Sequence, residues 1–289
     1  MSPETAIPSS FRDPCGFVFE KDGEIYRQVN RCYQRDFDLL KSSGLMGELQ
    51  KDGLLIAHEE LSNDSQRGKY CYKILKPERL PFISYPYEWC FSQLKDAALL
   101  TLEIQSRSLH HGMILKDASA YNIQFKDCRP VMIDTLSFSA YSEGSPWVAY
   151  KQFCQHFLAP LSLLSYRDPS LGQLLQTNID GIPLDLAANL LPKRSYLNLF
   201  ISMHIHMHAH SQSKYSDVHG ASELKNAGRL KRKGLEGIID SLKSCVSGLH
   251  LKNRTTQWQN YYNEHNYSGV SFKAKQKIVE SFLKKASPS

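Results

Sequence analysis

The sequence predicts an α+β protein in which a small antiparallel sheet precedes a larger helical part. Alternating β-forming residues dominate the first ~90 residues, with one helical stretch between them, and helical periodicity dominates after Trp89. The composition agrees with a folded chain, because 42% hydrophobic and 22% charged residues among 289 are typical of globular proteins. The same figures exclude a chain that is disordered throughout.

The first part of the chain carries the signals of four strands and one helix. Residues 1–15, with prolines among Ser and Thr, predict a flexible arm. Asp22-Gly23 stands between runs of β-forming residues and predicts a hairpin turn. Residues 32–53 have apolar side chains at helical spacing and predict a helix that Gly44 bends or divides. The predicted strands are 17–20, 24–29, 54–61 and 69–77.

The second part is predicted to be mainly helical. Residues 91–112 have apolar positions at a period of about 3.6 and end at glycine, so they predict one long helix. Two short β-forming pieces follow, at 123–125 and 130–133, on either side of a turn. Residues 147–200 read as helices interrupted by prolines.

The positive charge is concentrated in the C-terminal part. The chain has a formal charge of +6, but residues 211–289 carry 14 Lys and Arg against 6 Asp and Glu. This range predicts a basic helical extension. A nucleic-acid partner for the basic run 229–234 stays open but is disfavoured, because the aromatic residues that follow it, Trp258, Tyr261 and Tyr262, have the spacing of a packing stripe.

The cysteines and the hydropathy indicate a cytoplasmic protein. The seven cysteines are odd in number, widely spaced and without a Cys-x-x-Cys pair, which is atypical of a disulfide framework or a zinc site. The sequence contains no apolar, charge-free run of ~18 residues and no signal-peptide core at its start. We therefore expect no membrane partner.

The most informative segment is 111–138, which spaces three oxygen-bearing side chains in a characteristic way. Asp117 is followed after five residues by Asn122, and Asp134 comes at the end of a short apolar strand. Phosphoryl transfer needs a carboxylate that orients the attacking hydroxyl, together with an amide and a second carboxylate that hold Mg²⁺. The spacing predicts that a hairpin brings all three side chains to one place.

These residues resemble the protein-kinase-like fold, particularly its aminoglycoside phosphotransferase branch, over residues 16–210. The resemblance implies a two-lobed fold with an N-lobe at 16–90 and a C-lobe at 91–210. It implies ATP and Mg²⁺ as cofactors and a small-molecule hydroxyl as substrate, with Asp117 as the catalytic residue and Asn122 and Asp134 as metal ligands. The residues expected to line the substrate pocket are Trp147, Tyr150, Gln152, His156 and Arg167.

The sequence departs from the kinase pattern at several positions. Leu115-Lys116 stand where His-Arg are usual, Thr135-Leu136 replace the Phe-Gly that normally follows the metal-binding Asp, and no glycine-rich loop or strand lysine is present. Two functions therefore stay open: a phosphotransferase, and an inactive pseudokinase that recruits substrate or partner.

Three further residues are expected to contact the nucleotide by their order along the chain. Arg27 is nearest to the usual place of the strand lysine, and an arginine can clamp a phosphate. Asp36 or Asp38 stands where the acidic partner of that lysine would be, and Asp38 is the one we assign to the site. Glu88, in the aromatic stretch 85–89, falls where the hinge between the lobes is expected.

A narrower resemblance covers nearly the whole chain. The stretches PFISYPYEWCFSQLKDAALLTL, LKDASAYNIQF and PWVAYKQFCQHFLAPLSLLSYRD resemble the N-terminal part of bacterial S-adenosylmethionine-dependent methyltransferases, some of them labelled nodulation proteins. The resemblance implies a methyltransferase partner, in cis or in trans, toward which the extension 211–289 leads. No strand followed by Gly-x-Gly occurs in the sequence, so S-adenosylmethionine is expected to bind only through that absent domain.

Four histidines alternate along the stretch 203–211, at positions 204, 206, 208 and 210. On a helix, pairs four residues apart can chelate zinc. No acidic residue is adjacent to serve as a general base, and packing or surface histidines on a helix explain the pattern equally simply. We favour the packing interpretation and leave the zinc site open.

Overall fold

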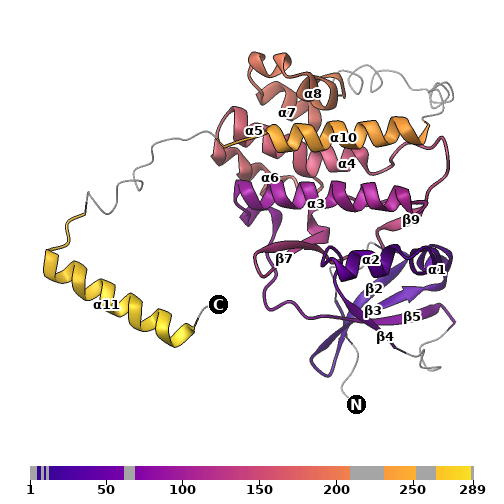
Figure 1. Ribbon diagram of the computed structural model, residues 1–289, viewed down its shortest axis with the longest axis horizontal. Coiled ribbons are helices and arrows are strands. Elements are labelled where there is room, and N and C mark those ends of the chain that lie inside the picture. The colour runs from indigo at the N-terminus through magenta and orange to yellow at the C-terminus, as the bar shows by residue number, and fades with distance from the viewer. Residues whose placement is uncertain are drawn as a thin grey trace. The chain divides into compact units, whose positions relative to one another are not determined.

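The computed structural model describes residues 5–7, 10, 13–61, 69–208, 231–251 and 265–287. A five-stranded antiparallel sheet forms the N-terminal part (Figure 1). Its strands are β1 (Thr5–Ala6), β2 (Gly16–Lys21), β3 (Glu24–Asn30), β4 (His58–Leu61) and β5 (Cys71–Pro77), in the order β1-β2-β3-β5-β4. Asp22 and Gly23 have φ of 52° and 77°, so they form the hairpin turn that the sequence predicts between β2 and β3.

The range predicted as a flexible arm is instead tied to the sheet where the structure describes it. β1 pairs with β2, and the N–H of Val18 donates to Ser10 Oγ at 2.8 Å. Gly16 lets the chain pass close to β3, because a Cβ there would lie 2.0 Å from the carbonyl oxygen of Gln28. The sequence does not predict β1, because this strand is only two residues long and stands among prolines.

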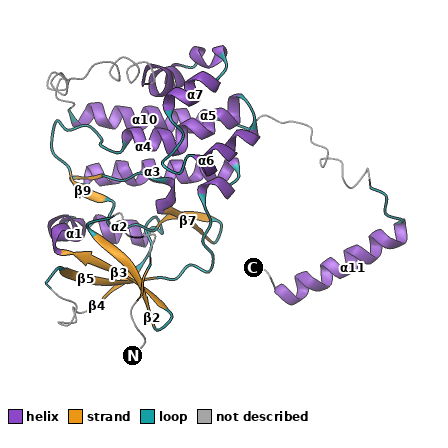
Figure 2. Ribbon diagram, turned by 180° about the vertical axis from the view of Figure 1, so that it is seen from behind, coloured by secondary structure: helices purple, strands orange, loops and turns teal. Residues whose placement is uncertain are grey.

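Two helices cover one face of the sheet (Figure 2). They are α1 (Gln34–Ser42) and α2 (Leu45–Lys51), and Gly44, with φ of 84°, divides them as predicted. Phe37 and Leu49 are among their fully buried side chains. The strand predicted from residue 54 begins only at His58, because residues 54–57 leave the sheet and Leu55 forms a bridge to Met132 instead.

The helical part is built around α3 (Phe91–His110), which confirms the predicted long helix. Two small hairpin-like sheets follow it: β6 (Met113–Leu115) pairs with β9 (Phe138–Ala140), and β7 (Ile123–Lys126) pairs with β8 (Arg129–Met132). The remaining helices are α4 (Tyr150–Phe153), α5 (Ala159–Tyr166), α6 (Leu174–Thr177), α7 (Leu184–Leu190) and α8 (Leu199–Ile201), with π-helical turns at Cys154–Leu158 and Ser202–His206.

One continuous hydrophobic core joins the sheet part to the helical part. It runs from Phe37 on α1 and Leu49 on α2, through α3, to Phe153 and Leu161. Tyr33 crosses between the two parts and donates a buried hydrogen bond of 2.7 Å to the carbonyl oxygen of Phe138. Because the sheet part and the helical part share this core, the core holds the two parts in one fixed arrangement.

The basic range 211–289 divides between two compact units, residues 1–251 and 252–289. Helix α10 (Arg232–Gly248) belongs to the first unit and packs on α3. Its apolar face is buried, with Leu235, Ile239 and Leu242 at most 1% exposed. On the other side of the contact, Lys95 Nζ donates to the carbonyl oxygens of Ser247 and Leu249.

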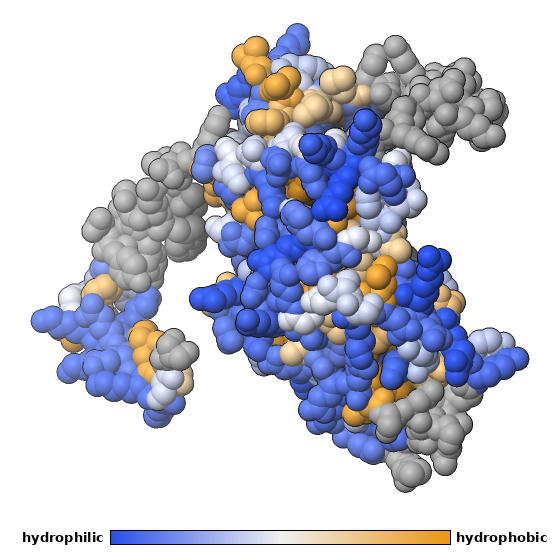
Figure 3. Space-filling model, turned by 45° about the vertical axis from the view of Figure 1, so that its right-hand side comes forward, coloured by the Kyte–Doolittle hydropathy of each residue, from blue (hydrophilic) through white to orange (hydrophobic). Residues whose placement is uncertain are grey.

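The second unit contains helix α11 (Gly269–Ala286). None of its residues is buried, and hydrophobic side chains stand out on an otherwise hydrophilic helix (Figure 3). These exposed residues are Val270, Ile278, Val279, Phe282 and Leu283. No helix in the part of the chain that the structure describes is long and apolar enough to span a bilayer.

Candidate functional site

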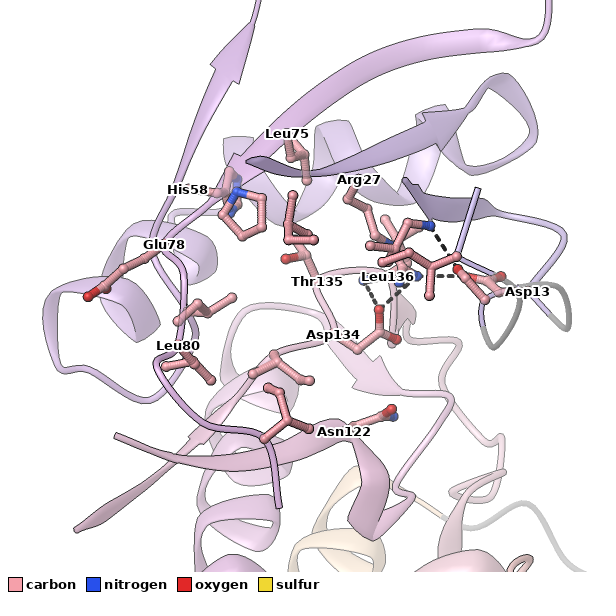
Figure 4. A pocket seen from close by; sticks show the side chains of 18 of the residues that line it. Asp13, Arg27, His58, Leu75, Glu78, Leu80, Asn122, Asp134, Thr135 and Leu136 are labelled. Atoms are coloured by element: carbon pink, nitrogen blue, oxygen red, sulfur yellow. Dashed lines mark hydrogen bonds and ion pairs between the residues drawn. The ribbon is translucent and has the colours of Figure 1, made fainter. Parts of the chain in front are cut away.

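A cavity of about 940 Å³ lies between the sheet and the loops of the helical part. Its walls come from strands β2, β3 and β5, from the linker 77–83 and from the two loops that carry Lys116, Asp117 and Asn122 and residues 133–136. Five described residues before β2 and two residues at or just before the start of β4 complete the lining: Ile7, Ser10, Asp13, Pro14, Cys15, Ile56 and His58. Figure 4 shows Asp13, Arg27 and Asp134 turned toward one another on one side and Leu75 and His58 on the other. The cavity therefore has a polar end and an apolar end.

Arg27 on β3 is the centre of the polar end. Its Nη2 lies 2.8 Å from Asp134 Oδ1 and 2.8 Å from Asp13 Oδ2. The Nε of the same guanidinium is buried and has no hydrogen-bond partner among the described residues. A buried donor without an acceptor is costly, and Arg27 is also a lining residue of the cavity.

Asp117 is held by a glutamine from α4. Gln152 Nε2 donates to Asp117 Oδ1 at 2.9 Å, and Gln152 Oε1 accepts from the N–H of Ala118 at 2.7 Å. The N–H of Ser119 donates to the same carboxylate oxygen at 2.9 Å. His156 lies near this carboxylate, and burial lowers its pKa to about 4, so its imidazole is neutral at pH 7.

Asn122 and Asp134 are joined through Ser137. The amide nitrogen of Asn122 donates to Ser137 Oγ at 3.1 Å, and Ser137 Oγ donates to Asp134 Oδ2. The N–H of Ile133 donates to the carbonyl oxygen of Asn122 at 2.8 Å, which fixes the two loops side by side. The β7–β8 hairpin thus brings Asn122 and Asp134 close together, although they are well separated in the sequence.

Three oxygen-bearing side chains, those of Asp117, Asn122 and Asp134, line the same cavity. Such oxygens suit Mg²⁺, which keeps several water or phosphate ligands when it binds with a nucleotide. The described residues contain no group of three or more His, Cys, Asp or Glu that could hold a metal ion by itself. The donor set therefore fits a Mg²⁺ ion that arrives with phosphates better than a metal site made by protein alone.

The apolar end offers two walls and a strip of backbone. Ile25 and Leu75 face it from the sheet, and Ile133 faces it from the loop below. The linker passes along its edge at Leu80, whose backbone N–H and C=O have no hydrogen-bond partner among the described residues. A flat aromatic ring with polar edges would find apolar faces and backbone partners here.

The structure brings together four of the six predicted site residues and leaves two elsewhere. Arg27, Asp117, Asn122 and Asp134 all line the cavity. Asp38 does not, because it is exposed on α1 and accepts a hydrogen bond from Tyr72 Oη. The alternative, Asp36, accepts from the N–H of Ala140 at 3.0 Å. Neither carboxylate is the partner of Arg27, whose partners are Asp13 and Asp134.

Glu88 also lies outside the cavity lining. Its carboxylate accepts from the N–H of Tyr85 at 2.8 Å and caps the short 3₁₀ helix Pro86–Glu88. The rings of Tyr85 and Tyr87 stack on each other, 5.5 Å apart. The linker that lines the cavity is 77–83, directly after β5, and none of residues 85–89, where the hinge was expected, lines it.

Three contributors to the polar end were not assigned to it from the sequence: Asp13, Lys116 and Ser137. Lys116 Nζ lies over the ring of Tyr33, 4.4 Å from its centroid, and 3.2 Å from Cys15 Sγ. Lys116 and Ser137 stand close to Asp117 and Asp134 in the sequence, which is a signal that the sequence alone offers. Asp13 reaches the site from a distant segment, and no local pattern marks it. Gln152, expected to line the substrate pocket, contacts Asp117.

The histidine stretch packs into the helical part. His204 has both ring nitrogens in contact, Nδ1 with Tyr150 Oη at 2.6 Å and Nε2 with Ser241 Oγ at 2.7 Å. His206 Nε2 lies 2.8 Å from Ser195 Oγ. Burial lowers the pKa of His204 to about 4. The fourth histidine, at position 210, and the aromatic residues of 252–264 lie outside the described residues.

The chain is similar to a curated protein, "Nodulation protein NoeA" of Rhizobium meliloti (strain 1021). The two are 32% identical over 287 residues, which are 98% of this chain and 60% of that protein. The chain thus spans about three fifths of the length of the relative it matches. No protein-family model matches the sequence.

Proposed function

We propose that the chain is a kinase-like module that binds ATP with Mg²⁺ in the cavity and transfers phosphate to a hydroxyl of a small molecule. The sheet part and the helical part would then be its two lobes. Residues 13–15, which line the cavity directly before β2, would contact the phosphates in place of a glycine-rich loop. The linker 77–83 would be the hinge that contacts the adenine. The cavity between these elements supports this arrangement.

The observation that carries the proposal is the state of Arg27. Its guanidinium lines the cavity, and its Nη2 contacts the carboxylates of Asp13 and Asp134. Phosphate oxygens in the cavity would add acceptors to this charged group, and arginine binds phosphate through charge-assisted hydrogen bonds.

The other residues of the polar end have roles that follow from their contacts. Asp117, fixed by Gln152, would orient the substrate hydroxyl and accept its proton as the oxygen attacks the γ-phosphorus. Asn122 and Asp134 would hold Mg²⁺ through their side-chain oxygens. The ion, when bound, supplies charge that offsets the negative phosphates.

Mg-ATP-dependent thermal stabilisation tests the proposal. Wild-type protein should be stabilised by millimolar Mg-ATP, because a ligand that binds only the folded state raises its melting temperature. Asp134→Ala should abolish the stabilisation, whereas Asp38→Ala, an exposed aspartate outside the cavity, should leave it unchanged. A wild-type chain that shows no shift at millimolar Mg-ATP would contradict the proposal.

A second function, an inactive pseudokinase that recruits substrate or a partner for an S-adenosylmethionine-dependent methyltransferase, is favoured by one observation as far as the inactivity is concerned. Asp134 is paired with Arg27, which competes with a metal ion for the same carboxylate. The two functions differ in product: a phosphotransferase releases ADP and a phosphorylated acceptor from Mg-ATP, and a pseudokinase binds the nucleotide unchanged or not at all.

A further inference from the structure

Ser137 lies between the two side chains that we assign to the metal ion. It follows the loop that carries Asp134 and is fully buried. Its Oγ contacts both Asn122 Nδ2 and Asp134 Oδ2. Its carbonyl oxygen accepts from the N–H of Lys116 at 2.8 Å, so its backbone is fixed to the segment that leads into Asp117.

The hydrogens at Ser137 determine which way the amide of Asn122 points. A carboxylate can only accept, so the single hydroxyl hydrogen of Ser137 must go to Asp134. Ser137 Oγ can then only accept from Asn122, which must present its NH₂ group. The amide oxygen of Asn122 is thereby turned away from Ser137, and it accepts no hydrogen bond among the described residues.

We propose that Ser137 is a positioning residue that orients Asn122 and Asp134 as metal ligands. Asn122 lines the cavity, so the oxygen freed by this arrangement is the atom that can face Mg²⁺. Without the hydroxyl, the amide of Asn122 can rotate, and its NH₂ group repels a cation. The inference rests on the proposed function, because it assigns a second layer of residues to that same site.

The test uses Mn²⁺ as the probe, because its free and bound forms differ in electron paramagnetic resonance. The full chain is titrated with Mn²⁺ in the presence of a non-hydrolysable ATP analogue. Ser137→Ala should weaken Mn²⁺ binding by about 10-fold or more, the usual effect of removing a group that orients a metal ligand. Ser137→Thr keeps the hydroxyl and should retain most of the affinity.

A double variant separates orientation from a general loss of packing. Asp at position 122 presents an oxygen whichever way its side chain turns. In the Ser137→Ala background, Asn122→Asp should therefore restore Mn²⁺ affinity. In the wild-type background the same substitution places two carboxylates beside the single hydroxyl of Ser137, so it should not improve Mn²⁺ binding. Melting temperatures of all variants, measured without ligand, report any loss of folding separately.

The outcomes distinguish this inference from the proposed function. If Ser137→Ala folds and binds Mn²⁺ as tightly as wild type, or if Asn122→Asp fails to rescue it, the role of Ser137 is wrong and the nucleotide site stands. If the wild-type chain binds neither Mn²⁺ nor the analogue, the proposed function fails and the role of Ser137 falls with it.

Discussion

Two clusters of polar side chains lie inside the first unit, and they differ in charge. The histidine cluster (Tyr150, Ser195, His204, His206 and Ser241) is composed of neutral groups, because burial holds the pKa of His204 near 4. Both ring nitrogens of His204 are paired, whereas His206 is paired at Nε2 and its buried Nδ1 has no partner among the described residues. The polar end of the cavity is composed of charged groups around Arg27, whose Nε–H has no partner among the described residues.

The comparison shows how to separate a structural polar cluster from a binding site. Neutral groups that pair with one another stabilise the fold and need nothing further. Buried charges that border a cavity cost stability, and a ligand of opposite charge bound there would offset part of that cost. By this criterion His204, which belongs to an apparent metal motif in the sequence, is a packing residue, and the charged polar end is the candidate site.

The largest expected effect is on Arg27. Arg27→Gln should weaken binding of ATP by about 100-fold, because charge-assisted hydrogen bonds to phosphate contribute about 1.5–3 kcal/mol each. It should also lower the melting temperature without ligand, since Asp13 and Asp134 lose the charge that separates them. Titration of ATP followed by protein fluorescence measures the affinity.

Arg35→Gln is the matched control, because Arg35 is an exposed arginine on α1 away from the cavity. It should bind ATP as wild type does. Equal weakening of ATP binding in both variants would mean that the effect comes from the net charge of the protein. The polar end of the cavity would then no longer differ from the histidine cluster as a binding site.

Acid should destabilise the protein through the buried histidines. The pKa of His156 and of His204 is lowered to about 4 in the folded state, against 6.5 in the unfolded chain. The unfolded chain therefore takes up protons first, and stability falls as the pH drops below 6.5 toward 4. Each histidine should cost about 2 kcal/mol by pH 5, which urea unfolding at pH 7 and pH 5 measures.

His204→Gln should flatten this pH dependence, because the titrating group is gone, even if stability at pH 7 is also lower. A variant with the same slope as wild type between pH 7 and pH 5 would mean that His204 is not buried in its neutral form. The histidine cluster would then no longer contrast with the charged end of the cavity.

Gln152→Ala should lower turnover by about 10-fold if the protein is an active kinase. The carboxylate of Asp117 loses the donor that holds it, so the orientation of the attacking hydroxyl or water is impaired. Gln152 does not line the nucleotide cavity, so KM for ATP should change little. Steady-state release of ADP measures both values. An increase in KM with unchanged kcat would assign Gln152 to nucleotide binding instead.

The smallest expected effect is that of zinc. Because His204 uses both ring nitrogens within the protein, equilibrium dialysis with Zn²⁺ should show no binding tighter than micromolar. Tight binding that is lost in His204→Gln would show that the histidine cluster can act as a metal site.

The sequence predicts the elements that depend on local signals. The Asp22-Gly23 turn, the break at Gly44 and the helix α3 are each encoded within a few residues and are found as predicted. Asp117, Asn122 and Asp134 are predicted to lie together because Asn122 and Asp134 flank one hairpin and Asp117 precedes it by a short loop. Their use as a nucleotide site remains a prediction.

Contacts between distant segments could not be predicted in this way. Arg27 pairs with Asp13 and not with Asp36 or Asp38, because Asp13, which precedes β2, lines the same cavity. The packing of α10 on α3 joins residues that are far apart in the chain, and its basic, amphipathic sequence resembles that of the exposed α11. The same pattern fits a packed and an unpacked helix, so only the tertiary structure distinguishes them.

Calorimetric titration of the full chain with Mg-ATP is the decisive test of nucleotide binding at the polar end. We expect one nucleotide per chain, with affinity that depends on Mg²⁺, is lost in Asp134→Asn and is retained in Asp38→Asn. Absence of binding to wild-type protein at millimolar Mg-ATP, or equal binding in Asp134→Asn, would contradict it.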